Sequence, residues 1–266
     1  MSKFRAHPLC LVAAALLVAQ PVLADTDEQR LADLVLANRI LAHEGVLDGF
    51  GHVSVRSARN PKHFYMARSR AAALVTREDI VEFDEESRAI DAKGRELYSE
   101  RYIHGEIFRA RPDVQAVVHS HSTAVLPFSL TKAPLKAVIH VAYFLGTDPA
   151  PVFDLRAAEG EDNHMLVRST RSGAALARAL GSRSVVLMRG HGMAVAGNSV
   201  REAVFKAIYT QVNAQVQAEA MKIGQPVFLN EFEASRTERI DRQWELWARS
   251  VASQSAAGSP AAAAVH

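Results

Sequence analysis

The stretch from Ser99 to Ser122, SERYIHGEIFRARPDVQAVVHSHS, decides how the rest of the sequence is interpreted. Its second half is rich in β-branched residues at Val114–Val118 and predicts a strand that ends in His119-Ser120-His121. Side chains two residues apart on a strand point to the same face, so His119 and His121 are expected to project together. Two such imidazoles make half of a metal site, although the pair alone is equally typical of ordinary strand-end histidines.

The first half of this stretch predicts a helix over Glu100–Arg111. Ser99 is expected to cap its N-terminus and Pro112 to stop it. Glu100 would then lie at the helix start, within reach of the histidine pair. His104 follows four residues later on the same helix face, and we assign it a supporting or packing role rather than that of a ligand.

A third segment adds another histidine to this pair. Ser184–Met188 is a short apolar strand followed by Arg189-Gly190-His191-Gly192. Flanking glycines give the backbone freedom and leave little bulk around the ring, which suits a ligand or a base, although a lone histidine there is more often an ordinary loop residue. Together the sequence offers three imidazoles and one carboxylate, a set that suits zinc or manganese: Glu100, His119, His121 and His191.

These motifs, in this order, resemble the class II aldolase/adducin family. The resemblance rests on Glu100, Arg111-Pro112-Asp113, His119-x-His121 and Arg189-Gly190-His191-Gly192, and it spans residues 31–231. The family includes fuculose-phosphate and rhamnulose-phosphate aldolases, ribulose-phosphate 4-epimerase, metal-dependent decarboxylases of hydroxylated pyridine and aromatic dicarboxylic acids, and adducin.

The resemblance implies a fold, an assembly and a set of metal ligands. The expected fold is a single α/β/α domain with a central, mostly antiparallel sheet flanked by helices, and the expected assembly is a homotetramer. The resemblance also implies that His119, His121 and His191 hold one divalent metal ion per subunit. Glu100 is then either a fourth ligand or the catalytic acid/base beside the ion.

Two segments differ from the sugar-phosphate aldolases. Those enzymes carry Gly-Asn where this sequence has Gly51-His52, and Gly-His-Val-Ser-x-Arg here resembles the decarboxylase branch, although His52 could equally reflect a packing change. Arg68-Ser69-Arg70, at the end of the predicted strand that begins at Phe64, replaces a small-residue phosphate loop. An arginine fork binds carboxylates, so Arg68 and Arg70, expected on one face, favour a carboxylated and non-phosphorylated substrate. Either arginine taken alone is as well explained as a solvated surface residue.

The resemblance also places Val138–Gly146 near a subunit boundary, where an aromatic hydroxyl of a neighbour can enter the active site. Tyr143 is the candidate for that substrate-binding role, and a core aromatic is the alternative. His140 is a weaker pocket candidate, for which a core or loop role is the simpler interpretation.

Local patterns predict the remaining elements. Trp244 and Trp247, three residues apart, are expected to dock the last helix on the body or on a neighbouring subunit. The other expected strands are Gly51–Arg56, the end of Thr76–Asp84, and Val152–Asp154, and the expected helices are Asp27–Glu44, Thr123–Leu130, Thr170–Leu180, Ser199–Ile223 and Glu231–Val251.

The two ends of the chain are expected to lie outside the fold. Lys3 and Arg5, followed by an apolar run and Val22-Leu23-Ala24, predict a secretory signal peptide over residues 1–24 and export to a bacterial periplasm. Cys10, the one cysteine, lies in that segment, so the remaining chain has no disulfide. We expect one domain over residues 25–251 and a disordered tail over residues 252–266.

Charge excludes one class of partner. The sequence has 31 Lys and Arg against 29 Asp and Glu, and removal of Lys3 and Arg5 with the signal leaves the two signs equal. A basic surface for nucleic acid is therefore not indicated, and no stable membrane association is expected once the signal is removed. The expected partner is a small-molecule substrate.

The favoured hypothesis is a metal-dependent carbon–carbon lyase that decarboxylates a small hydroxylated, aromatic or cyclic carboxylic acid. A class II aldolase acting on a non-phosphorylated or sugar-derived hydroxy-carbonyl compound uses the same metal residues and stays open. A catalytically silent, adducin-like binding module is the third possibility, which the presence of all four metal-site residues disfavours.

Overall fold

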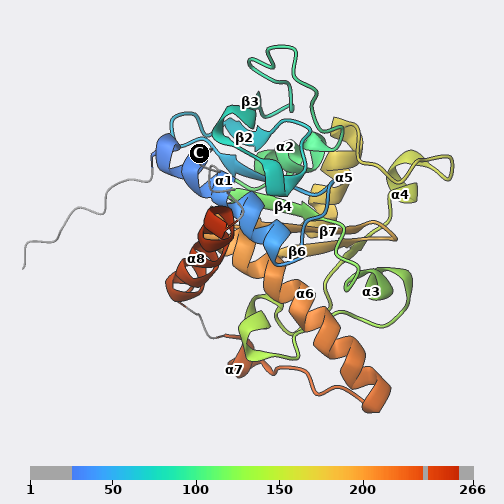
Figure 1. Ribbon diagram of the computed structural model, residues 1–266. Coiled ribbons are helices and arrows are strands. Elements are labelled where there is room, and N and C mark those ends of the chain that lie inside the picture. The colour runs from blue at the N-terminus through green and yellow to red at the C-terminus, as the bar shows by residue number, and fades with distance from the viewer. Residues whose placement is uncertain (1–25, 236–238, 258–266) are drawn as a thin grey trace, which may run out of the picture.

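A seven-stranded sheet runs through the protein, whose structure, a computed structural model, describes residues 26–235 and 239–257 (Figure 1). All neighbouring strands are antiparallel except β5 and β6, which confirms the expected mostly antiparallel sheet. In spatial order the strands are β3 (Ile80–Asp84), β2 (His63–Ala67), β1 (His52–Arg56), β4 (Ala116–Ser120), β7 (Gly192–Gly197), β6 (Val185–Met188) and β5 (Val152–Phe153).

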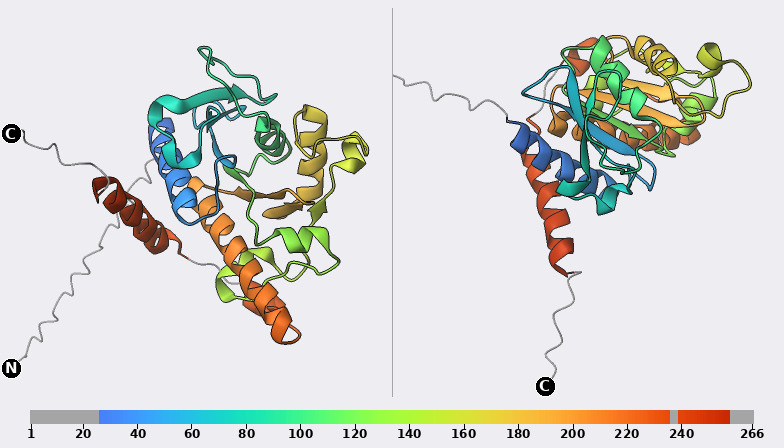
Figure 2. Two further views of the ribbon diagram at one scale, coloured as in Figure 1. Left: turned by 45° about the vertical axis from the view of Figure 1, so that its right-hand side comes forward. Right: turned by 90° about the horizontal axis from the view of Figure 1, so that it is seen from above.

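Helices cover both faces of this sheet (Figure 2). On one face lie α1 (Asp27–His43), α6 (Val200–Ile223) and α8 (Asp241–Ala257), which contact one another. On the other face α2 (Arg101–Ala110) packs against α5 (Thr170–Leu180). The shorter helices are α3 (Leu126–Leu130), α4 (Arg156–Glu159), α7 (Glu231–Ala234) and the 3₁₀ turns η1 (Ala72–Leu74), η2 (Arg77–Asp79) and η3 (His140–Leu145).

Capping residues define the two helices that were predicted most closely. Ser169 and Ser199 occupy the N-cap positions of α5 and α6, where each side chain accepts a bond from a first-turn N–H. Gly181 ends α5 with a positive φ of 55°, a conformation that glycine adopts without strain. These ends lie where the sequence predicts them because capping depends on neighbouring residues only.

Two predicted helix boundaries are wrong. Ser99 does not cap α2, because Glu100 occupies the N-cap position and its carboxylate turns away to bond the Val167 amide. The last helix is not continuous over Glu231–Val251 but is divided into α7, capped by Asn230, and α8. The helix α8 also continues to Ala257, past the expected start of the tail, in keeping with the high helix propensity of alanine.

The tryptophans of α8 dock on the body of the same chain. Trp244 and Trp247 are buried, and the ring of Trp247 lies 6.2 Å from that of Tyr209 on α6. The guanidinium of Arg201, also on α6, lies 5.3 Å from the ring of Trp244. These two contacts attach α8 to α6 in the helical layer on that face of the sheet.

The predicted signal peptide, residues 1–24, and the last part of the predicted tail, residues 258–266, lie outside the described residues. Within the described part of the chain, every helix is too short or too polar to cross a lipid bilayer.

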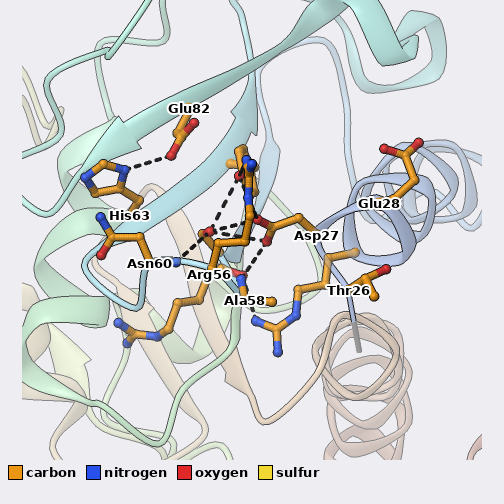
Figure 3. A network of polar contacts seen from close by, with 12 residues as sticks. Thr26, Asp27, Glu28, Arg56, Ala58, Asn60, His63 and Glu82 are labelled. Carbon is orange, nitrogen blue, oxygen red and sulfur yellow. Dashed lines mark hydrogen bonds and ion pairs between the residues drawn. The ribbon is translucent and has the colours of Figure 1, made fainter. Parts of the chain in front are cut away.

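A polar network fastens the start of α1 to the loop between β1 and β2 (Figure 3). The Asp27 carboxylate accepts bonds from the Ala58 amide at 2.6 Å, the Arg59 Nε at 2.6 Å and the Tyr65 hydroxyl at 3.1 Å. The Ser57 hydroxyl donates to the same carboxylate. Burial acts to raise the pKa of Asp27, but these donors outweigh it and hold the pKa below its ordinary value.

We expect the change Asp27→Asn to lower the free energy of unfolding at pH 7 by about 1–3 kcal/mol, because several donors lose a charged acceptor. A carboxyl with a lowered native pKa contributes stability above its unfolded pKa of about 3.9 and loses it as the pH falls through the native pKa. The difference from the original protein should therefore shrink below about pH 4. Urea unfolding at pH 7 and below pH 4 measures this difference in the free energy of unfolding.

The control is Glu28→Gln, which removes a neighbouring acid whose side chain is 80% exposed. It should change the unfolding free energy little at either pH. An Asp27→Asn effect of equal size at both pH values would show that the ionised form of Asp27 is not what the network stabilises.

Candidate metal centre

Four predicted ligands meet at one end of the central strands. His119 lies in β4, His121 follows the end of that strand, His191 lies in the turn from β6 to β7, and Glu100 precedes α2. One ligand atom from each lies within 4.8 Å of the others. The Nε2 atoms of His121 and His191 are 3.1 Å apart, and Glu100 Oε2 lies 3.6 Å from His119 Nε2 and 3.4 Å from His191 Nε2. The structure thus brings the whole predicted set together.

The opposite ring nitrogens fix how two of these imidazoles are protonated. His119 Nδ1 donates to the Met193 carbonyl at 3.0 Å, and His191 Nδ1 donates to the Met165 carbonyl at 2.6 Å. A carbonyl only accepts, so each neutral ring carries its proton on Nδ1 and its lone pair on Nε2. Carbonyl partners of this kind are typical of metal-binding histidines.

The resulting cluster fits a cation. His119 Nε2 is buried and has no hydrogen-bond partner within the described part of the chain. Lone pairs from imidazoles and a carboxylate oxygen that face one point repel each other unless a positive charge lies between them. Three nitrogens and one oxygen suit a divalent transition-metal ion such as zinc or manganese.

Glycine allows the turn that carries His191 to approach β4. Gly190 and Gly192 both have positive φ, 64° and 155°. A Cβ atom on Gly192 would lie 2.0 Å from the carbonyl oxygen of Ser120, which is far too close. The two glycines therefore let the turn pack against the strand end, which places the ring of His191 beside that of His121.

Glu100 is held by its second oxygen. Its Oε1 accepts a bond from the Val167 amide at 2.8 Å, while Oε2 faces the histidines. Burial acts to raise the pKa of Glu100, but contacts with His119 and His191 outweigh it and hold the pKa below its ordinary range. The carboxylate is therefore ionised and joins the cluster to the loop before α5.

A pocket with a volume of about 430 Å³ opens beside this cluster. Glu100 and His121 form part of its wall. The remaining wall combines apolar side chains, hydroxyls and charges, contributed by Gly49, Phe50, His52, Ser69, Arg70, Ala71, Glu96, Leu97, Tyr98, Ser99, Leu166 and Arg168.

His52 links this pocket to a buried hydrogen-bonded chain. Its Nδ1 lies 2.6 Å from His104 Nε2, and His104 Nδ1 lies 2.6 Å from the Ser54 hydroxyl. Burial lowers the pKa of both histidines, that of His104 to about 3, so both are neutral. The ring of His52 lies 5.1 Å from that of His119 and is tilted by 47°, and His104 contacts His52 and is not one of the four clustered ligands.

Both predicted substrate-binding arginines contact an acid that the sequence analysis did not connect to them. Both side chains follow β2 and contact Asp79: Arg68 Nε at 2.7 Å and Arg70 Nε at 3.3 Å. Arg70 also donates to the Leu74 carbonyl and lines the pocket, whereas Arg68 does not line it. The two side chains thus reach the same acid from one side, as strand periodicity predicts, and their joint role at the substrate stays a prediction.

Two further residues concern the pocket, one of them predicted and the other not. Tyr143 is half-buried on η3, with its ring 5.9 Å from that of Phe144, and it is not among the residues that line the pocket. Its predicted role needs a neighbouring subunit and stays a prediction. Arg168 lines the pocket although no motif singles it out, because only the tertiary fold brings it near Glu100.

Comparisons with known proteins agree with this geometry. Residues 32–218 match the family described as Class II Aldolase and Adducin N-terminal domain. Decarboxylase tropJ of Talaromyces stipitatus is 36% identical over 240 residues, which cover 80% of this chain and 90% of that protein. The 3,4-dihydroxyphthalate decarboxylase of Arthrobacter keyseri is 32% identical over 202 residues, which cover 72% of this chain and 78% of the relative.

Among solved structures, the L-fuculose 1-phosphate aldolase from Glaciozyma antarctica PI12 superposes with a TM-score of 0.70 and 26% identity, covering 90% of this chain and 96% of the aldolase. The fold and the sequence match therefore lead to the same conclusion. The chain belongs to the class II aldolase and adducin family.

Proposed function

We propose that this protein is a metal-dependent carbon–carbon lyase that decarboxylates a small hydroxylated, aromatic or cyclic carboxylic acid. The observation that carries the proposal is the pocket beside the four-ligand cluster, where arginine and histidine side chains meet apolar walls. Relatives named as decarboxylases, at 36% and 32% identity, support the same reaction class.

The backbone around the arginines favours a carboxylate over a phosphate. A phosphate loop offers free backbone N–H groups to the anion. Here the Arg68 amide donates to the Asp79 carbonyl at 2.7 Å, and the Ser69 amide donates to the Glu96 carbonyl at 2.9 Å. These two donors are occupied, so at Arg68 and Ser69 an anion would be bound by side chains, and a guanidinium group matches a carboxylate.

The cluster would hold one divalent ion through His119, His121, His191 and Glu100. When bound, such an ion acts as a Lewis acid that stabilises the negative charge left on the substrate as a carbon–carbon bond breaks. The chain itself supplies orientation: Phe50 and Leu166 form apolar walls, and the neutral His52 offers a hydrogen bond from the pocket surface.

Glu100 suits the role of a ligand better than that of a proton donor. One of its oxygens accepts the Val167 N–H and the other faces the histidine nitrogens. Burial acts to raise the pKa of Glu100, but these contacts stabilise the ionised carboxylate and keep that pKa below its ordinary range, which disfavours the protonated form. We therefore propose that Glu100 holds the ion.

An aldolase is the second candidate, because an L-fuculose 1-phosphate aldolase shares the fold at 26% identity. In that reaction the departing fragment is an aldehyde, and the ion held by the same cluster would stabilise the negative charge left on the substrate. The aldolase is the weaker candidate because the relatives named as decarboxylases are more similar in sequence, at 36% and 32% identity. A silent binding module would have no use for ligand nitrogens oriented in this way.

The first prediction concerns the metal. His119→Ala removes a nitrogen at the buried centre, so metal content after purification without chelator should fall well below one ion per chain while the circular dichroism spectrum is retained. The matched control is His63→Ala, a histidine on β2 that pairs with Glu82 away from the cluster. Full metal content in the His119 variant would refute the assignment.

The second prediction separates the two roles of Glu100. In Glu100→Gln the amide oxygen can still accept from Val167, but the other atom becomes an amide nitrogen that cannot ligate. We expect metal affinity to fall at least about tenfold, measured by competition with a chelator. If metal affinity is retained and only turnover falls, by roughly 10²-fold, Glu100 is a proton carrier and not a ligand.

The third prediction concerns the substrate class. The metal-loaded enzyme should release carbon dioxide from one or more hydroxylated aromatic dicarboxylic acids and should leave fuculose and ribulose phosphates unchanged. Gas release and aldehyde formation are measured on the same panel. Aldehyde from a sugar phosphate, with no carbon dioxide from any acid, would establish the aldolase instead.

A further inference from the structure

Arg168 differs from the other arginines near the pocket in having no acidic partner. It is exposed, lines the pocket and forms no ion pair with any part of the chain that the structure describes. Arg70, which lines the same pocket, contacts Asp79 and the Leu74 carbonyl. An unpaired guanidinium keeps its full capacity to bind an anion.

The backbone on both sides of Arg168 is held in place. The preceding residue, Val167, is buried and donates its amide proton to Glu100 at 2.8 Å. The following residue, Ser169, caps α5 by accepting from the Ser172 amide at 3.1 Å. Arg168 therefore starts from a fixed point one residue away from a metal-site contact, which reduces the cost of ordering its side chain on a ligand.

Glu96 is the acid that could compete for this arginine. It lines the same pocket and is exposed, yet it forms no ion pair with Arg168. The pocket thus presents two arginines, Arg70 and Arg168, against Glu96 and the metal-site Glu100. With the Asp79 partner of Arg70 also counted, a divalent ion at the cluster would leave the pocket with a net positive charge, which suits an anionic substrate.

We propose that Arg168 determines substrate specificity by binding a carboxylate that the reaction does not remove. This inference rests on the proposed decarboxylase function and makes it more specific. A cation that binds the departing carboxylate stabilises the ground state and opposes the loss of carbon dioxide. The carboxylate at Arg168 is therefore an anchor, and the substrate is a hydroxylated dicarboxylic acid whose product keeps one carboxylate.

The test is a binding measurement that needs no turnover. The two probes are 3,4-dihydroxybenzoate, which has a diol and one carboxylate, and catechol, which has the same diol and no carboxylate. Both are titrated calorimetrically into the metal-loaded enzyme. Arg168→Gln should lower the affinity for 3,4-dihydroxybenzoate about 10- to 100-fold, which is the scale of one charge-assisted bidentate contact. It should change the affinity for catechol less than about twofold.

Three further variants make the result specific. Arg171→Gln removes the same charge from an exposed arginine of α5 that lines a different pocket, and should leave both affinities unchanged. Arg168→Lys should recover part of the loss, because it keeps the charge but not the fork. Glu96→Gln should bind 3,4-dihydroxybenzoate with an affinity equal to or higher than that of the original protein.

Several outcomes would overturn the proposal. They are an unchanged affinity in Arg168→Gln, an equal loss for both probes, the same loss in Arg171→Gln, or a fall in the metal content of Arg168→Gln. Weaker binding in Glu96→Gln would show instead that Arg168 and Glu96 close the pocket as a pair. Absence of carbon dioxide from every acid would refute the proposed function but would leave this binding result intact, so the two failures are distinguishable.

Discussion

Convergence of three imidazole lone pairs and one carboxylate oxygen is the constraint on which the rest of the site depends. Such an arrangement is unfavourable without a cation, so the surrounding chain has to hold it in place. The carbonyls of Met193 and Met165 accept hydrogen bonds from the Nδ1 atoms of His119 and His191. The turn at Gly192 packs against the end of β4. Backbone groups thus orient His119 and His191, whereas His121 Nδ1 faces the Asp48 carboxylate at 3.4 Å.

Local signals predicted the separate parts of this cluster, and the family resemblance implied that they hold one ion together. His119 and His121 share a face through strand periodicity, and the glycines around His191 mark a turn. The caps of α5 and α6 are equally local, since a serine bonds an amide three residues away. Where the relevant contact joins distant segments, prediction failed: Glu100 replaced Ser99 as the N-cap of α2 because its carboxylate bonds Val167.

The directions of Arg68 and Arg70 also depend on a contact that local sequence patterns do not predict. Arg68 and Arg70 are correctly placed near the end of a strand, but their direction depends on Asp79, which is itself fixed by a capping box with Thr76. The capping box could have been identified from the sequence. Its effect on the two arginines could not, because an ion pair across a sheet edge requires the fold. Arg168 lacks any local signal, since the residue before an N-cap serine has no characteristic identity.

Position relative to the metal cluster explains why an arginine on this loop is better placed to select a substrate than one on β2. The Val167 bond to Glu100 couples the loop to the ligand set, so the backbone that carries the Arg168 side chain is fixed relative to the cluster. A rigid aromatic acid with its diol on one side and a carboxylate on the other spans a fixed distance. Two anchors, of which one is fixed and the other is carried by a fixed backbone, favour such a molecule over a flexible sugar phosphate, which would lose more conformational entropy on binding.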